Sequence, residues 1–183
     1  MSKVGIFFAT GYEEIEALTV VDMLRRAGIE AKMVSVTGEK TVTSSHGVTV
    51  VMDSLIEEEN LDTFDMLVLP GGMPGTTNLQ NCPKLMDAVV SFANAGKTVA
   101  AICAAPSVFG TLGILKGKKA CCYPGFEDKL EGADVNMDSV NVDGNIITSR
   151  GMGTAIDFSL AIVEKLVGVE KAESLAKAII YRS

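Results

Sequence analysis

The sequence predicts a doubly wound α/β protein in which a mostly parallel sheet is covered by helices on both faces. Two observations carry this prediction. Short apolar or β-branched runs alternate with helical patterns along the chain, and this alternation is typical of parallel sheets. The chain also has 183 residues, of which 48% are hydrophobic, enough for one buried core. We therefore expect a single domain over residues 1–183.

Two strand–helix–strand units occupy the first part of the chain. The first consists of an apolar run at 4–9, an amphipathic pattern at 13–27 that ends before Gly28, and a second run at 31–36. The second consists, in the same order, of 66–69, 83–95 and 98–102. A further helix is expected at about 104–112, directly after the last of these strands.

Two hairpins and two helices complete the prediction. Segments 41–45 and 48–52 flank His46-Gly47 and predict a hairpin on one edge of the sheet. Segments 140–142 and 146–148 flank Asp143-Gly144, a strong signal for a two-residue turn. The helical patterns 154–166 and 171–181 follow, separated at Gly168.

Charge and cysteine content exclude several function classes. Sixteen Lys and Arg against 23 Asp and Glu give a net charge of -7, so no basic surface is expected for nucleic acid or an anionic membrane. The four cysteines contain no C-x-x-C pair and the only histidine is His46, so neither a metal ion nor a disulfide framework is expected. With no secretory or spanning pattern, we expect a cytoplasmic protein with reduced thiols.

Ligands of open α/β sheets bind at the carboxyl ends of the strands. Three segments directly follow predicted strands: 10–13, 70–75 and 103–106. The last begins with Cys103, at a strand-to-helix elbow where free N–H groups of the helix start favour a thiolate. The alternative is a buried structural cysteine, since free cysteine is among the most buried residue types.

The other two segments contribute glycines and acids. Gly71 and Gly72 have no side chain where a loop approaches a ligand, so they either expose a backbone N–H as an oxyanion donor or only form a tight turn. On the first helix, Glu13 and Glu16 project on or beside the buried face, whereas Glu14 lies on the other flank. The helical spacing does not separate Glu13 from Glu16, and acids in a first turn also compensate the helix dipole.

The remaining cysteines and the histidine have simpler interpretations. Cys82 precedes a proline in a loop, and Cys121-Cys122 lie in a short β-like run where sheet packing explains them. His46 is expected in a solvated turn that could approach Cys103 only from a partner subunit.

Five short segments follow one another across nearly the whole chain. They are 11–16 (GYEEIE), 22–28 (DMLRRAG), 69–72 (LPGG), 100–106 (AAICAAP) and 148–154 (TSRGMGT). Together they resemble the ThiJ/PfpI superfamily, and within it the DJ-one branch of protein deglycase and glyoxalase III-like proteins. The resemblance implies a flavodoxin-like fold and a homodimer.

The resemblance also implies roles for individual residues. It assigns the nucleophile to Cys103, the acid in contact with its sulfur to Glu16, and the oxyanion donors to the backbone N–H groups of Gly72 and Ala104. In the protease-like branch a histidine follows the cysteine, whereas here Ala104 does, so peptidase activity is not expected. Segment 131–134 also lacks the histidine of the animal glyoxalase-type members, and His46 stands where some members have an arginine.

Two functions fit such a cysteine–glutamate site. The first is an enzyme without cofactor that acts on methylglyoxal or on its adducts with proteins, with Cys103 attacking the carbonyl and a protonated Glu16 moving the proton. The second is a redox-responsive or chaperone-like protective protein in which an exposed, low-pKa Cys103 is oxidised to a sulfinate. Both functions use the same residues, so only turnover distinguishes them.

Overall fold

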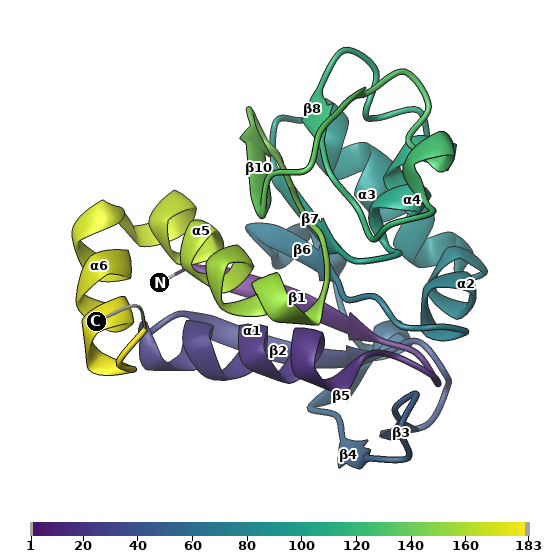
Figure 1. Ribbon diagram of the computed structural model, residues 1–183. Helices are drawn as coiled ribbons and strands as arrows, with labels where there is room; N and C mark the ends of the chain where they lie inside the picture. Colours follow the sequence, from purple (N-terminus) through teal and green to yellow (C-terminus); the bar gives the residue numbers. More distant parts are fainter. Residues whose placement is uncertain (1, 182–183) are drawn as a thin grey trace.

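Residues 2–181, which the computed structural model describes, form a central seven-stranded sheet in the order β10-β11-β7-β6-β1-β2-β5 (Figure 1). All neighbouring strands are parallel except β10, which is antiparallel to β11. The strands are β1 (Lys3–Phe8), β2 (Glu30–Ser35), β5 (Ser54–Leu55), β6 (Met66–Leu69), β7 (Thr98–Ile102), β10 (Val140–Asp143) and β11 (Ile146–Ser149).

The five central parallel strands have the order of the flavodoxin-like fold. Along the sheet they run β2-β1-β6-β7-β11, which is second, first, third, fourth and fifth in the chain. The order reverses between β1 and β6, and ligands of this fold bind at such a reversal, outside the carboxyl ends of the strands. The predicted doubly wound, flavodoxin-like α/β class is confirmed.

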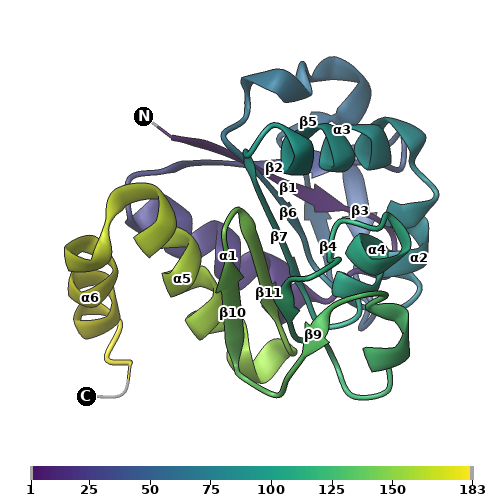
Figure 2. The same ribbon diagram turned by 90° about the horizontal axis from the view of Figure 1, so that it is seen from above.

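Helices cover both faces of the sheet, and each face has its own hydrophobic core (Figure 2). On one face α1 and α5 pack together, with residues such as Leu24 and Phe158 fully buried between them and the sheet. On the other face lie α3 and α4, which bury Val89 and Phe109. The helices are α1 (Glu14–Arg26), α2 (Gly75–Gln80), α3 (Pro83–Asn94), α4 (Pro106–Thr111), α5 (Ala155–Val167) and α6 (Val169–Ala178).

Helix α1 shows how the sequence positions one acid at the sheet. Its buried face contains Ala17, Val20 and Leu24, and Glu16 lies on that face with 1% of its surface exposed. Basic residues occupy its last turn, where they complement the helix dipole, and Gly28 follows at a φ of 80° that other residues rarely adopt. The apolar face therefore fixes the rotation of the helix, and with it the direction of Glu16.

Several small elements lie outside the main sheet. Strands β3 (Thr41–Thr43) and β4 (Thr49–Val51) pair only with each other, as do β8 (Lys119–Ala120) and β9 (Asp134–Val135). Short 3-10 helices are η1 (Ile56–Glu58), η2 (Leu61–Thr63), η3 (Glu127–Lys129) and η4 (Met152–Thr154). No helix within residues 2–181 is long and apolar enough to cross a membrane.

The predicted strand–helix units, the second hairpin and the C-terminal helices are confirmed, with shifts at their ends. Three predictions need correction. The 41–52 hairpin exists but does not form an edge of the main sheet, which ends at β5 on that side. Helix α4 begins at Pro106 rather than near residue 104, because the chain first turns at Cys103. Cys121 and Cys122 follow β8 instead of lying within a strand.

Candidate active site

Three segments that follow β1, β6 and β7 meet at the carboxyl ends of these neighbouring strands. The first contributes Glu16 from the first turn of α1, the second contributes Gly71 and Gly72, and the third contributes Cys103. The structure therefore brings together the residues that the sequence singled out in each segment. Their meeting point is the end of the sheet beside the reversal of strand order.

Cys103 occupies a strained backbone position at the elbow between β7 and α4. Its φ is 66°, in the left-handed region that costs a residue with a Cβ about 1–2 kcal/mol. Two neighbouring segments hold it there. The Cys103 N–H donates to the carbonyl oxygen of Ser149 at 3.0 Å, and its own carbonyl oxygen accepts from the N–H of Tyr123 at 2.8 Å. The side chain is half-buried and faces Glu16 and the glycine loop.

Gly71 packs so tightly against both functional side chains that only glycine fits. A Cβ at this position would lie 2.6 Å from Cβ of Cys103 and 2.7 Å from Oε2 of Glu16. Its N–H donates to that same Oε2 atom at 2.9 Å, which holds the carboxyl group in place. Gly71 therefore acts both as a spacer and as a donor to Glu16, a role that the sequence alone did not indicate.

Gly72 has the geometry of a tight turn, which is one of the two interpretations that the sequence left open. Its φ of 91° and the crowding of its missing Cβ by the backbone of Tyr12 and Glu13 are those of a tight turn. Its N–H also hydrogen-bonds to the Cys103 sulfur, as does the N–H of Ala104. The two predicted oxyanion donors thus converge on one point beside the thiol.

The thiol and the carboxyl group of the site form a coupled pair. Burial raises the pKa of Glu16 to about 7, against the opposing effect of its hydrogen bonds to Cys103 and Gly71. Burial, together with the negative charge of Glu16, raises the pKa of Cys103 to about 12. The pair therefore holds a single proton between these limits, and that proton lies either on sulfur or on oxygen.

The expectation of an exposed, low-pKa thiol is wrong for Cys103. The hydrogen bonds from Ala104 and Gly72 do lower its pKa, but desolvation and the facing carboxylate outweigh them. A thiolate forms near neutral pH only when the shared proton lies on Glu16.

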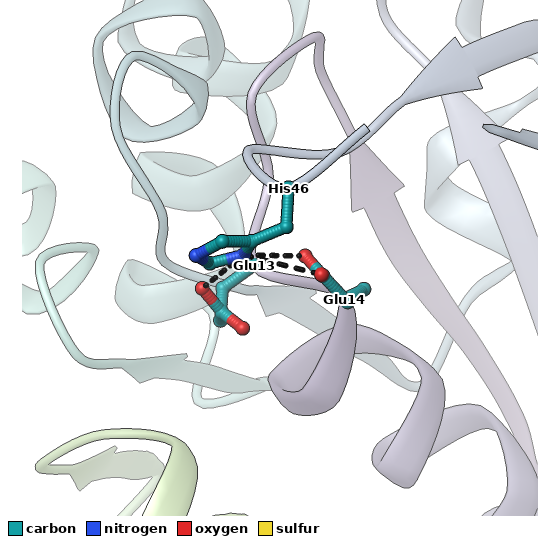
Figure 3. Close-up of side chains that lie close together, drawn as sticks. All are labelled: Glu13, Glu14 and His46. Atoms are coloured by element: carbon teal, nitrogen blue, oxygen red, sulfur yellow. Dashed lines mark hydrogen bonds and ion pairs between the residues drawn. The ribbon is translucent and has the colours of Figure 1, made fainter. Parts of the chain in front are cut away.

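Glu13 and Glu14 lie beside His46 of the β3–β4 hairpin, as Figure 3 shows. Nδ1 of His46 lies 3.1 Å from Oε1 of Glu14 and 3.6 Å from Oε2 of Glu13. The hydroxyl group of Ser45 donates to the same Glu13 oxygen at 3.3 Å. Of the two acids that the helical spacing left undecided, Glu16 contacts Cys103 and Glu13 contacts the hairpin.

His46 lies in the turn of the β3–β4 hairpin. Its side chain is 66% exposed, as expected for a solvated turn. Its hairpin packs against the segment before α1 of the same chain, where Ser45 donates its N–H to the carbonyl oxygen of Tyr12 at 2.8 Å. His46 therefore reaches the acids at the start of α1 without a partner subunit.

The other cysteines play no part in this arrangement. Cys121 and Cys122 are buried, and the Cys121 thiol lies 3.4 Å from the carbonyl oxygen of Thr148, to which it donates. Cys82 is half-buried at the start of α3. All four cysteines are free thiols in the structure. Ser149 and Tyr123, which hold the elbow, were missed because they act through backbone atoms that leave no mark on side-chain patterns.

Comparison with known protein families decides the relationship. The model of the DJ-1/PfpI family matches residues 2–165. The chain belongs to the DJ-1/PfpI family. This confirms the resemblance that the five sequence segments indicated.

Relatives within the DJ-1/PfpI family share both sequence and structure with this chain. The structure of oxidized Toxoplasma gondii DJ-1 is 38% identical with a TM-score of 0.96, each chain being covered over 100% of its length. Protein DJ-1 homolog B of Arabidopsis thaliana is 42% identical over 98% of this chain, which spans 42% of that relative's length. The glutathione-independent glyoxalase DJR-1.2 of Caenorhabditis elegans is 34% identical over 91% of this chain and 89% of its own length.

Proposed function

We propose that this DJ-1/PfpI protein converts methylglyoxal-type dicarbonyls, free or as adducts on proteins, to hydroxy acids without a cofactor. The observation that carries the proposal is the contact between the Cys103 thiol and the buried Glu16 carboxyl, with two backbone N–H groups aimed at the same point. A relative that is named a glyoxalase supports the same class of reaction. A nucleophile, a proton carrier and oxyanion donors are the groups that this chemistry needs.

The first step joins sulfur to the aldehyde carbon. With the shared proton on Glu16, the Cys103 thiolate attacks that carbon and the carbonyl π electrons move to oxygen. The N–H groups of Gly72 and Ala104 stabilise the resulting alkoxide, which then takes the proton from Glu16 to give a hemithioacetal. Glu16 is left as a carboxylate, buried beside the substrate.

The second step moves hydrogen between the two carbons. The Glu16 carboxylate removes the proton from the former aldehyde carbon and delivers it to the neighbouring ketone carbon, so the first carbon is oxidised and the second reduced. The hydroxyl proton of the hemithioacetal passes to the former ketone oxygen, which becomes the hydroxyl group of the product. The product is a thioester of lactate on Cys103. Water then hydrolyses this thioester, which releases lactate and restores the thiol. Methylglyoxal and water are consumed, and no external oxidant or reductant is needed.

The same residues argue against a peptidase. A cysteine peptidase needs a base that later protonates the departing amine, a task usually performed by histidine. Here the residue after Cys103 is Ala104, and the hydrogen bonds and ion pairs of His46 involve Ser44, Ser45, Glu13 and Glu14. We expect no hydrolysis of casein or of peptides above background.

Lactate formation tests the proposed function. Wild-type protein incubated with methylglyoxal should form lactate, Cys103→Ser and Glu16→Gln should form none above background, and Glu39→Gln should match wild type because Glu39 is an exposed residue outside the site. The rate should rise with pH through about 7, where the Cys103–Glu16 pair goes from two bound protons to one. Normal turnover by Glu16→Gln, or peptide hydrolysis abolished by Cys103→Ser, would overturn the proposal.

A redox-responsive, protective role is the second candidate. The match to a solved DJ-1 structure of the oxidized form favours it, as does the Glu16 hydrogen bond that a sulfinate on Cys103 would accept. Limiting peroxide should then add two oxygen atoms to Cys103 before any other residue, detected by mass spectrometry of the digest. Sulfinate formation without lactate turnover would favour this role over the enzyme.

We also propose that the chain pairs with a second copy of itself. Ile15 lies on the outer side of α1 and is 47% exposed, between two acids that face the molecule's own hairpin and core. Its side chain is therefore available for an apolar contact with a second copy.

A further inference from the structure

We propose that Glu13, Glu14 and His46 form a binding site for Zn²⁺ or a closely similar divalent transition-metal ion at the junction of helix α1 and the β3–β4 hairpin. Figure 3 shows the three side chains converging from the two elements. One ligand atom from each residue lies within 4.8 Å of the other two. This site is separate from the thiol chemistry and does not depend on the proposed function.

Two of the three separations between ligand atoms are close to those of zinc coordination. Bonds of about 2.0–2.2 Å at tetrahedral angles place neighbouring donors roughly 3.3–3.6 Å apart. Nδ1 of His46 lies 3.1 Å from Oε1 of Glu14 and 3.6 Å from Oε2 of Glu13. An ion therefore fits after small rotations of side chains. The Ser45 hydroxyl, 3.1 Å from Nδ1 and 3.3 Å from Oε2 of Glu13, lies at the same point.

The two elements are joined by their backbones before any ion binds. The N–H of Gly11 donates to the carbonyl oxygen of Thr43 at 2.9 Å, and Ser45 donates to Tyr12 at 2.8 Å. Each carboxylate side chain is only 13% exposed, so packing restricts its movement, whereas His46 is 66% exposed. The acids are thus largely preorganised, and the histidine side stays open to water as a further ligand.

Charge and ligand type favour a transition metal over magnesium or calcium. With His46 neutral the three side chains carry two negative charges, and within residues 2–181 no lysine or arginine forms an ion pair with either carboxylate. A divalent cation neutralises them. An imidazole nitrogen suits zinc, whereas magnesium and calcium favour oxygen ligands alone. Sequence spacing excluded a metal site because the ligands come from two segments that only the fold brings together.

Bound zinc would fasten the hairpin to the first turn of α1. That first turn also contains Glu16. The N–H of the preceding Glu13 donates to the carbonyl oxygen of Gly71 at 2.9 Å. The ion would therefore stabilise the elements on which the cysteine–glutamate pair is built.

The single histidine of the chain allows a direct test. Long-range ¹H–¹⁵N spectra of the imidazole ring are recorded while ZnCl₂ or MgCl₂ is added to the full-length protein. Zinc should shift the Nδ1 signal saturably and magnesium should leave it unchanged. Because the signal arises from His46 alone, zinc bound to cysteines does not contribute to this measurement.

Single substitutions identify the other ligands. Glu13→Gln and Glu14→Gln should each weaken zinc binding at His46 by about tenfold or more, since losing even an outer-shell partner costs 10–100-fold. Glu39→Gln removes an exposed acid of the same charge from outside the cluster and should bind as wild type does. No shift at millimolar zinc, wild-type affinity in both cluster variants, or loss of binding in Glu39→Gln would overturn the proposal.

Discussion

Replacing Glu16 with glutamine should stabilise the folded protein at neutral and alkaline pH while removing its chemistry. Glutamine has nearly the same shape, its carbonyl oxygen can accept the N–H of Gly71, and its amide can donate to the Cys103 sulfur. The substitution therefore leaves the packing in place. What it removes is a carboxyl group that must ionise inside the protein, where 1% of its surface is exposed.

The expected magnitude follows from the raised pKa of Glu16. The pKa rises from 4.5 to about 7 on folding, and each tenfold change in acid dissociation is worth about 1.4 kcal/mol. Between these two values the folded state keeps a proton that the unfolded state has lost, so this contribution to stability is present at low pH and disappears as pH rises through about 7. The wild-type free energy of unfolding should fall by about 3 kcal/mol from this source, whereas Glu16→Gln escapes the loss.

Urea unfolding of both proteins at about pH 5 and about pH 8 measures the effect, because stability depends on pH only through groups whose pKa differs between the two states. Other titrating groups, including His46, contribute equally to both proteins and cancel in the difference. The raised pKa of Cys103 acts only at more alkaline pH. Glu39→Gln, an exposed site, should track wild type. If the difference in the free energy of unfolding between Glu16→Gln and wild type is the same at both pH values, the inference that folding raises the pKa of Glu16 is wrong.

Three further predictions concern the other parts of the site and the assembly. Gly71→Ala should reduce turnover by about 100-fold, because displacing catalytic groups by about 1 Å has that effect. Gly153→Ala, whose Cβ meets nothing within 4 Å, should leave the initial rate unchanged. Equal initial rates for the two variants would contradict the packing argument. A limiting alkylating agent should label Cys103 first. Preferential labelling of Cys82, detected by peptide mapping, would contradict the assignment of Cys103 as the reactive thiol. Light scattering should give twice 19.3 kDa for wild type and a monomer for Ile15→Glu, and a monomeric wild type would exclude the dimer.

The fold was predictable because its signals are local. Strands β1, β6 and β7 at the centre of the sheet are short apolar runs, and glycines such as Gly28 and Gly96, both at positive φ, end the helices that cross between strands. Helix α2 was missed because its sequence, beginning with Gly75 and two threonines, has weak helix propensity and is held by its surroundings. The 41–52 hairpin was found but misplaced, because nothing local to it specifies which strand it will contact.

The candidate site was predictable only in part, for a related reason. Strand ends can be located from the sequence, and parallel strands bring their ends together, so Cys103, Gly72 and the acids of α1 could be expected near one another. The choice of Glu16 over Glu13 required either the resemblance or the structure, since both lie near one face of the helix. The pKa of the thiol was mispredicted because desolvation depends on everything packed around it, which no single segment encodes.

The site concentrates several locally unfavourable features, and each one serves the contact between sulfur and carboxyl. Cys103 adopts a positive φ, Glu16 is an acid buried among apolar side chains, and Gly71 permits an approach that any Cβ would prevent. Strain and buried charge of this kind persist only where the surrounding structure determines them. Here the determinants are the cores on the two faces of the sheet and two backbone hydrogen bonds that hold the elbow, one donated by Cys103 to Ser149 and one donated by Tyr123 to Cys103. Because these supports act on the backbone, they fix the cysteine's position whatever its side chain is, so Cys103→Ser should keep the fold and lose only the reaction.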